Sequence, residues 1–247
     1  MQALLLNCDM GESFGNWRVG DEREALALVD QANLACGFHA GDFTVMAATV
    51  REAAHQGVSI GAHPAYPDLQ GFGRRAMAYS PAEVTDLMLY QIGALDAFCR
   101  AHQTQVDYVK PHGALYHAIA NDSAMFDAAL AACRLYRPGL ALMTLAVKDP
   151  APLERAASKQ GVPLLFEAFA DRAYLADGSL CPRSRPGAVH QSAELIIEQA
   201  LAIARGESIT DVDGNPLQIT ADTLCVHGDN EQSRAVLQQL RQALEEL

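Results

Sequence analysis

The sequence predicts an α/β fold in which a mostly parallel sheet closes, or nearly closes, into a barrel. Seven short apolar runs of strand length recur along the chain, with helical segments between them, and each run is continuous rather than alternating in hydrophobicity. Such strands are buried on both faces, as in a parallel sheet covered by helices. Because spacing alone does not report closure, an open doubly wound sheet is the alternative. The predicted strands are residues 3–6, 32–36, 58–60, 106–109, 140–144, 162–166 and 223–226.

Helices are expected between these strands. The clearest is residues 80–102, where apolar residues repeat every three and four positions. Its start is well signalled, because Ser80 can cap the exposed amides, Pro81 fits the first helical position and Glu83 completes a capping box. Most of the other candidates are followed by Gly or Pro, which end helices. These candidates are residues 42–56, 122–136, 152–160, 191–205 and 230–247.

The chain is expected to form a single domain over residues 1–247. Half of its 247 residues are apolar, which suffices for a large core, and no linker, repeat or low-complexity tract divides them. Residues 208–219 depart from the strand–helix alternation, since Asp213 and Gly214 lie between two runs that contain apolar residues. This pattern predicts a surface β-hairpin with a primed turn.

The charge balance argues against a nucleic-acid partner. The chain has 30 acidic and 18 basic residues, which give a formal charge of −12, and no basic stripe interrupts the acidic surface. Such a surface repels a phosphate backbone rather than gathering it. Nucleic acid is therefore excluded as an expected partner.

The first residues and the cysteines indicate a cytoplasmic protein. The opening MQALLLNCDM has no basic n-region and only three consecutive leucines, which predicts neither a signal peptide nor a membrane span. The six cysteines are scattered singly without a C-x-x-C pair, so we expect reduced thiols rather than disulfides or a four-thiolate zinc site.

Candidate catalytic residues gather in the segments that follow the predicted strands. In parallel α/β folds the carboxyl ends of the strands converge on one face, and the active site lies there. The first four strands lead into N-C-D-M-G-E, G-F-H-A-G-D, G-A-H-P and K-P-H-G-A-L-Y. We therefore expect a ring of carboxylates, histidines and one lysine. Its members are Asn7, Asp9, Glu12, His39, Asp42, His63, Lys110, His112, Tyr116, Glu167, Asp171, His227 and Asp229.

The recurrence of histidine supports a functional ring, although several members have structural alternatives. A single histidine in a loop is usually a surface or hydrogen-bonded residue. Asp42 and Asp229 are also suited to capping helices, and Glu12 could only support the turn at Gly11. Five of the eight histidines nevertheless fall just beyond strand ends: His39, His63, His112, His227 and, less clearly, His117.

Lys110 is unusual because the chain has only three lysines and otherwise uses arginine. A lysine that ends an apolar strand is expected to project into a polar pocket. There its charge could hold a carboxylate substrate or stabilise negative charge that develops on oxygen. The alternative is a salt-bridged lysine, or one whose stem carries the charge out to water.

Local signals for cofactors are few. Asp9, His39 and His63 would offer carboxylate and imidazole ligands to a divalent ion, although no H-E-x-x-H or H-x-H spacing is present. A nucleophilic triad has little support, since Cys36 has a histidine nearby only in sequence. Neither of the two glycine-rich motifs that bind nucleotide phosphates, G-x-x-x-x-G-K-[ST] and G-x-G-x-x-G, is present. The G-F-G-R-R segment with Arg74 could bind an anion or form a simple glycine-rich turn.

Six motifs in register resemble one family. They are LNCDMGE, NLACGFHAGD, IGAHPAYPD with GFGRR, VKPHGALY, FEAFADRAY with RSRPGA, and CVHGD. In this order and over nearly the whole chain, the sequence resembles the LamB/YcsF family. The resemblance implies a deformed seven-stranded β/α barrel akin to the glycoside hydrolase and deacetylase superfamily. It also implies ATP-dependent hydrolysis of the lactam 5-oxo-L-proline to L-glutamate, of the 5-oxoprolinase type, in a complex with two further subunits.

The resemblance and the candidate residues together suggest roles. ATP is the expected co-substrate, and because the chain lacks a phosphate loop we expect the partner subunits to supply much of the ATP chemistry. Lys110 would hold the substrate carboxylate or the developing oxyanion, and Asp9 or Glu12 would act as base toward water. His63 or His112 would transfer protons. The remaining expected substrate contacts are Asn7, His39, Asp42, Arg74, Tyr116, Glu167, His227 and Asp229.

Two other functions stay open at this stage. One is a metal-dependent deacetylase or amidase that acts without ATP. The other is a non-catalytic subunit that binds the lactam or scaffolds the other chains. The sequence also leaves open whether the chain forms a homo-oligomer and whether it contacts ATP directly.

Overall fold

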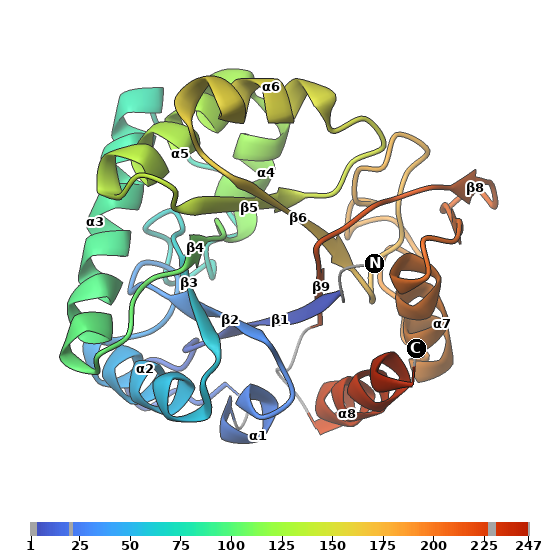
Figure 1. Cartoon of the computed structure of the whole chain (residues 1–247), viewed down its shortest axis with the longest axis horizontal. Coiled ribbons are helices and arrows are strands. Elements are labelled where there is room, and N and C mark those ends of the chain that lie inside the picture. The colour runs from blue at the N-terminus through green and yellow to red at the C-terminus, as the bar shows by residue number, and fades with distance from the viewer. Residues whose placement is uncertain (1–3, 20–21, 227–230, 247) are drawn as a thin grey trace.

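The chain folds as a closed barrel of parallel strands surrounded by helices (Figure 1). The computed structural model describes residues 4–19, 22–226 and 231–246. Strand β9 pairs with both β6 and β1 and so closes the ring, which confirms the predicted seven-stranded β/α barrel and excludes an open sheet. The barrel strands, in order around the ring, are β1 (Leu5–Met10), β2 (Gln31–Ala35), β3 (Ser59–His63), β4 (Tyr108–Val109), β5 (Ala141–Leu145), β6 (Leu164–Phe169) and β9 (Thr223–Cys225).

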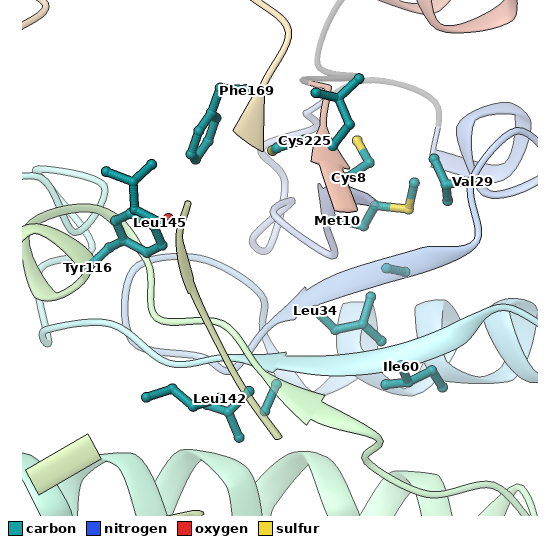
Figure 2. Close-up of a cluster of buried hydrophobic side chains, with 14 of the residues drawn as sticks. Cys8, Met10, Val29, Leu34, Ile60, Tyr116, Leu142, Leu145, Phe169 and Cys225 are labelled. Carbon is teal, nitrogen blue, oxygen red and sulfur yellow. The ribbon is translucent and has the colours of Figure 1, made fainter. Parts of the chain in front are cut away.

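Helices pack around the outside of the barrel, and buried apolar side chains fill the layer between them. Met10, Leu34 and Ile60 from neighbouring strands belong to this layer (Figure 2). All six predicted helices are present, whereas the short α1 and α4 were not expected. No helix in the described ranges is long and apolar enough to cross a membrane. The helices are α1 (Glu22–Leu26), α2 (Phe43–Gln56), α3 (Pro81–Ala101), α4 (Gly113–Asn121), α5 (Ser123–Tyr136), α6 (Ala151–Gln160), α7 (Ala193–Ala204) and α8 (Glu231–Glu245).

Helix α3 begins as its sequence predicts and also supports the segment after β3. The Glu83 amide donates to Ser80 Oγ at 3.3 Å, and the Ser80 amide donates to the Glu83 carboxylate at 2.7 Å, which confirms the capping box. Further along α3, the buried Gln91 side chain accepts from the amide of Ala65 and donates to its carbonyl. The helix therefore holds the chain just beyond the end of β3.

Side chains in the barrel strands alternate between the helix layer and the barrel interior. On β1 the even-numbered residues belong to the apolar core, whereas Asn7 and Asp9 make polar contacts with other strands. The strand register aligns Asn33 of β2 with both Asp9 and Gly61. Gly61 is in turn aligned with Tyr108 of β4. Four adjacent strands thus contribute to one inward-facing layer.

Strands β1, β3 and β6 extend further than the predicted apolar runs. Asn7, Asp9, His63 and Glu167 therefore lie within strands, and the expectation that they follow the strands in loops was wrong. The prediction ended each strand near its first polar residue. The interior of this barrel nevertheless holds polar side chains, because they hydrogen-bond and ion-pair with one another there.

The predicted surface hairpin is present, but its turn differs. Strands β7 (Ile209–Thr210) and β8 (Pro216–Leu217) pair antiparallel. The connection spans residues 211–215 instead of forming a two-residue primed turn. The Asp211 carboxylate accepts hydrogen bonds from the amides of Asp213 and Asn215 and organises this longer turn.

Candidate active site

Lys110 lies at the centre of a buried charge network inside the barrel. Its ammonium Nζ is 2.8 Å from Asp9 Oδ1 and 2.6 Å from Glu167 Oε1. The same nitrogen lies 3.3 Å from Asn7 Oδ1 and 3.3 Å from the Cys225 thiol. Burial disfavours the charge, but the neighbouring negative groups, Asp9 foremost, outweigh it and hold the pKa of Lys110 well above its ordinary value. Lys110 is therefore a fixed cation whose three donors are directed at protein groups.

A buried amide bridge orients Asp9. Asn33 Nδ2 donates to Asn7 Oδ1 at 2.8 Å and to Asp9 Oδ1 at 2.9 Å, while the Tyr108 hydroxyl donates to Asn33 Oδ1 at 2.7 Å. A Cβ at Gly61 would lie 2.1 Å from the Tyr108 ring, so glycine is needed there to admit the ring. Neither Asn33 nor Tyr108 was predicted as a site residue. Their signal is the strand register, which becomes visible only once the strands are aligned.

An aromatic side of the site lies next to the charge network. The Tyr116 hydroxyl donates to Glu167 Oε2 at 3.1 Å, and burial, with the Glu167 charge added, raises the pKa of Tyr116 well above its ordinary value. Tyr116 therefore stays a neutral donor. Its ring lies near Phe169, as Figure 2 shows, with centroids 6.2 Å apart, and Lys110 Nζ is 5.6 Å from the Phe169 centroid.

Three histidines and one glutamate converge beside Asp9, and we call Glu12, His39, His63 and His112 the histidine cluster. His63 Nε2 is 2.9 Å from His112 Nδ1, and Glu12 Oε1 is 3.3 Å from His39 Nε2. The rings of His39 and His112 stack with centroids 3.9 Å apart. One ligand atom from each residue lies within 4.8 Å of the others, and these are side chains that bind divalent metals. Burial holds the pKa of His39 and of His112 well below the ordinary value, so both rings are neutral.

Asp9 connects the charge network to the histidine cluster. Its Oδ1 faces Lys110, and its Oδ2 lies 3.3 Å from His63 Nε2. The side chains of Asp9 and Glu12 remain 15% and 10% exposed, whereas those of Lys110 and Glu167 are 3% and 0% exposed. Asp9 and Glu12 are thus the more accessible acids of the site.

A tight loop packs directly on the histidine cluster. The Phe72 carbonyl lies 2.9 Å from His112 Nε2, and the Phe72 ring contacts the rings of His39 and His112 edge-on. Phe72 has a φ of 54°, a strained value for a non-glycine residue. Asp68 holds the loop in this shape by accepting hydrogen bonds from the amides of Gly71 and Arg75. The loop thereby fixes the orientation of the His112 ring.

Most of the predicted ring residues come together, and a few have other positions. Asp42 accepts hydrogen bonds from the amides of Thr44 and Val45 and so caps α2, which is the structural role that was considered for it as an alternative. Arg74 is exposed, with its guanidinium carbon 5.5 Å from the Phe72 ring. His227 and Asp229 lie outside the described residues. The predicted residues that the structure brings together are Asn7, Asp9, Glu12, His39, His63, Lys110, His112, Tyr116 and Glu167.

The fold and the site together define a β/α barrel whose interior holds a buried group of carboxylates, imidazoles and one ammonium. Covalent catalysis by the nearby Cys36 is disfavoured, since burial raises the pKa of its thiol to about 12. The LamB/YcsF family profile matches residues 4–247, and the chain belongs to this family.

Similar proteins agree with this assignment. The chain is 64% identical over 244 residues to a 5-oxoprolinase subunit of Pseudomonas aeruginosa, covering 99% of this chain and 97% of the relative. It is 56% identical over 247 residues to a 5-oxoprolinase subunit of Chromohalobacter salexigens, covering 100% and 99%. A crystal structure of a lactam utilization protein from Thermus thermophilus superimposes with a TM-score of 0.91 at 43% identity, covering 100% of this chain and 97% of that one. These likenesses support a hydrolase that acts on an amide.

Proposed function

We propose that the chain is the subunit of an ATP-dependent 5-oxoprolinase in which the lactam ring of 5-oxo-L-proline is opened to L-glutamate. The names of the relatives support the substrate. The observation that carries the proposal is the position of Asp9, which has one oxygen on Lys110 and the other facing His63. A carboxylate held between a fixed cation and an imidazole is suited to activate water.

The contacts of Lys110 favour one of its two expected roles. Its three donors already have acceptors in Asp9, Asn7 and Cys225, and Glu167 forms an ion pair with it, so no donor is left to hold the substrate carboxylate. In our proposal Lys110 instead keeps Asp9 ionised and balances negative charge as it develops near the site. Arg74, the exposed cation beside the histidine cluster, binds the substrate carboxylate.

The histidines supply the proton that the leaving nitrogen requires. Opening the lactam breaks the bond between the ring carbonyl carbon and nitrogen, and the departing amine must gain a proton. His63 lies next to Asp9, and its Nε2 faces His112 at 2.9 Å. This pair can carry the proton that Asp9 takes from water to the ring nitrogen.

ATP makes the unreactive amide a better electrophile. In the proposed sequence the terminal phosphoryl group moves to the lactam oxygen and ADP leaves. Water then adds to the ring carbon, the carbon–nitrogen bond breaks, and a second water releases phosphate from the resulting acyl phosphate. Partner subunits contribute the ATP chemistry, since this chain has neither glycine-rich phosphate motif. We place the complex in the cytoplasm, because all six cysteines are free.

The histidine cluster also suits a divalent cation, because imidazole and carboxylate ligands converge there. Metal-dependent hydrolysis of the amide without ATP is the second candidate function, and the same convergence of imidazole and carboxylate ligands favours it.

The test incubates the purified chain with 5-oxoproline and ATP, with and without the candidate partner subunits, and measures ADP and glutamate together. We expect both products in equal amounts, and only when the partners are present. Glutamate without ADP would contradict the coupled mechanism and favour the metal-dependent amidase. If substitution of Asp9 weakened only assembly or substrate binding, with full turnover at saturation, a scaffold role would replace the catalytic one.

A further inference from the structure

The hydrogen bonds of two histidines determine which ring nitrogens carry hydrogen. His63 Nδ1 lies 2.7 Å from the backbone carbonyl of Lys110, and His112 Nε2 lies 2.9 Å from the backbone carbonyl of Phe72. A carbonyl oxygen only accepts hydrogen bonds, so each of these nitrogens must donate. In neutral rings the other nitrogens, His63 Nε2 and His112 Nδ1, then present lone pairs.

These two lone pairs point toward one another. His63 Nε2 and His112 Nδ1 are 2.9 Å apart, and two bare nitrogens at this distance have no hydrogen to share. A carboxylate closes the third side, with Glu12 Oε1 3.9 Å from His112 Nδ1. Together with Asp9 Oδ2, which lies 3.3 Å from His63 Nε2, these groups form a site that a metal ion or a shared proton can occupy.

His39 completes the arrangement from outside. Its Nδ1 is buried and has no hydrogen-bond partner among the described residues, which favours the ring form with its hydrogen on Nε2. That nitrogen lies 3.3 Å from Glu12 Oε1 and can donate to it. The His39 ring also stacks on His112. His39 thus orients two of the three converging groups, as outer residues around metal sites commonly do.

We propose that Glu12, His63 and His112 form a binding site for one divalent transition-metal ion. Two imidazoles and one carboxylate with a further position open are the ligand set of many catalytic zinc sites. Imidazole ligands favour zinc, cobalt or nickel over magnesium and calcium, which prefer oxygen. This set replaces the expected trio of Asp9, His39 and His63. His39 becomes an orienting residue, and Asp9 stays with Lys110.

A bound ion would supply Lewis acidity toward a carbonyl or phosphoryl oxygen. Because it would occupy His63 Nε2 and His112 Nδ1, Asp9 would pass the proton to the leaving nitrogen in the metal-bound chain, and the histidine pair would do so only without the ion. This use of the ion rests on the proposed function, whereas binding itself does not. Binding is therefore measured on the isolated chain, without ATP, substrate or partner subunits.

The test titrates the chelator-treated full-length chain with Zn²⁺ by calorimetry and with Co²⁺ by visible absorption. We expect one ion per chain, with a cobalt spectrum of low coordination number. Glu12→Gln, His63→Gln and His112→Gln should each lower the affinity by more than about a hundredfold, and His39→Gln by roughly ten- to a hundredfold. His55→Gln, at an exposed histidine on α2, should bind as the wild type does.

Two results would overturn the site. One is a correctly folded wild-type chain, verified by circular dichroism, that shows no saturable binding, which would leave a shared proton between His63 and His112. The other is unchanged affinity in the three ligand variants. The two proposals fail separately. A chain that binds metal but gives an inactive complex contradicts the proposed function alone. An active complex that neither binds metal nor responds to chelation contradicts the metal site alone.

Discussion

Two walls of the barrel interior differ in chemistry. The first, the polar wall, comes from strands β1 to β4 and the segments after them. The second, the apolar wall, comes from β5, β6 and α4, apart from Glu167 of β6, which ion-pairs with Lys110 of the polar wall. Under the proposed function, we expect the chemistry to take place on the polar wall and the apolar part of the ligand to lie on the other. The polar wall is Asp9, Glu12, His39, His63, Lys110 and His112, and the apolar wall is Tyr116, Leu145 and Phe169.

The largest effect is expected at the charge that organises the polar wall. Lys110→Met leaves Asp9 and Glu167 buried without their cation, which should cost about 3–5 kcal/mol of unfolding free energy. Glutamate formation by the reconstituted complex should fall at least about a hundredfold. Urea denaturation and a glutamate assay measure the two effects.

A second variant separates stability from catalysis. Lys110→Met combined with Glu167→Gln removes one of the two stranded charges, so it should regain stability without regaining activity. Full activity in either variant would remove Lys110 from the mechanism.

A smaller effect is expected one layer behind the polar wall. Tyr108→Phe leaves Asn33 Oδ1 without its donor in a fully buried position, which should cost about 1–3 kcal/mol of unfolding free energy. Because Asn33 orients Asp9, kcat should fall while KM stays constant. Tyr90→Phe, which alters an exposed tyrosine on α3, is the matched control. Unchanged stability and kcat in Tyr108→Phe would show that the amide bridge does not position Asp9.

The smallest effect is expected on the apolar wall. Phe169→Leu keeps an apolar side chain but reduces its contact area, so KM for 5-oxoproline should rise by roughly three- to tenfold, equivalent to about 1 kcal/mol. The value of kcat should be nearly unchanged, since the lost contact acts on substrate and transition state alike. Phe43→Leu, at an exposed phenylalanine, serves as the control. A large loss of kcat in Phe169→Leu would mean that the apolar wall contributes to the chemical step and not only to binding.

The sequence predicted the barrel and much of the polar wall for a physical reason. Polar residues at the ends of apolar runs stand out against their neighbours, which is how Asp9, His63 and Lys110 were found. Asn33 and Tyr108 could not be found in this way, because each lies inside a run that was expected to be apolar throughout. Their roles depend on strand register, and the register follows from closure of the ring.

The proposed metal site shows a second limit of the sequence. Residue type and position alone do not say which of His39, His63 and His112 would be ligands in the proposed site. The distinction lies in ring orientation, which backbone carbonyls of Lys110 and Phe72 determine for His63 and His112. The residue pattern does not show where those backbone carbonyls lie.

The central claim is that Asp9 activates water for ring opening, and Asp9→Asn tests it most directly. The amide has the shape of the carboxylate and can still accept a hydrogen bond from Lys110, so the fold and the assembled complex should be retained. The measurement is the rate of glutamate formation by that complex at saturating 5-oxoproline and ATP. We expect that rate to fall at least about a hundredfold. Glutamate formation at the wild-type rate would contradict it.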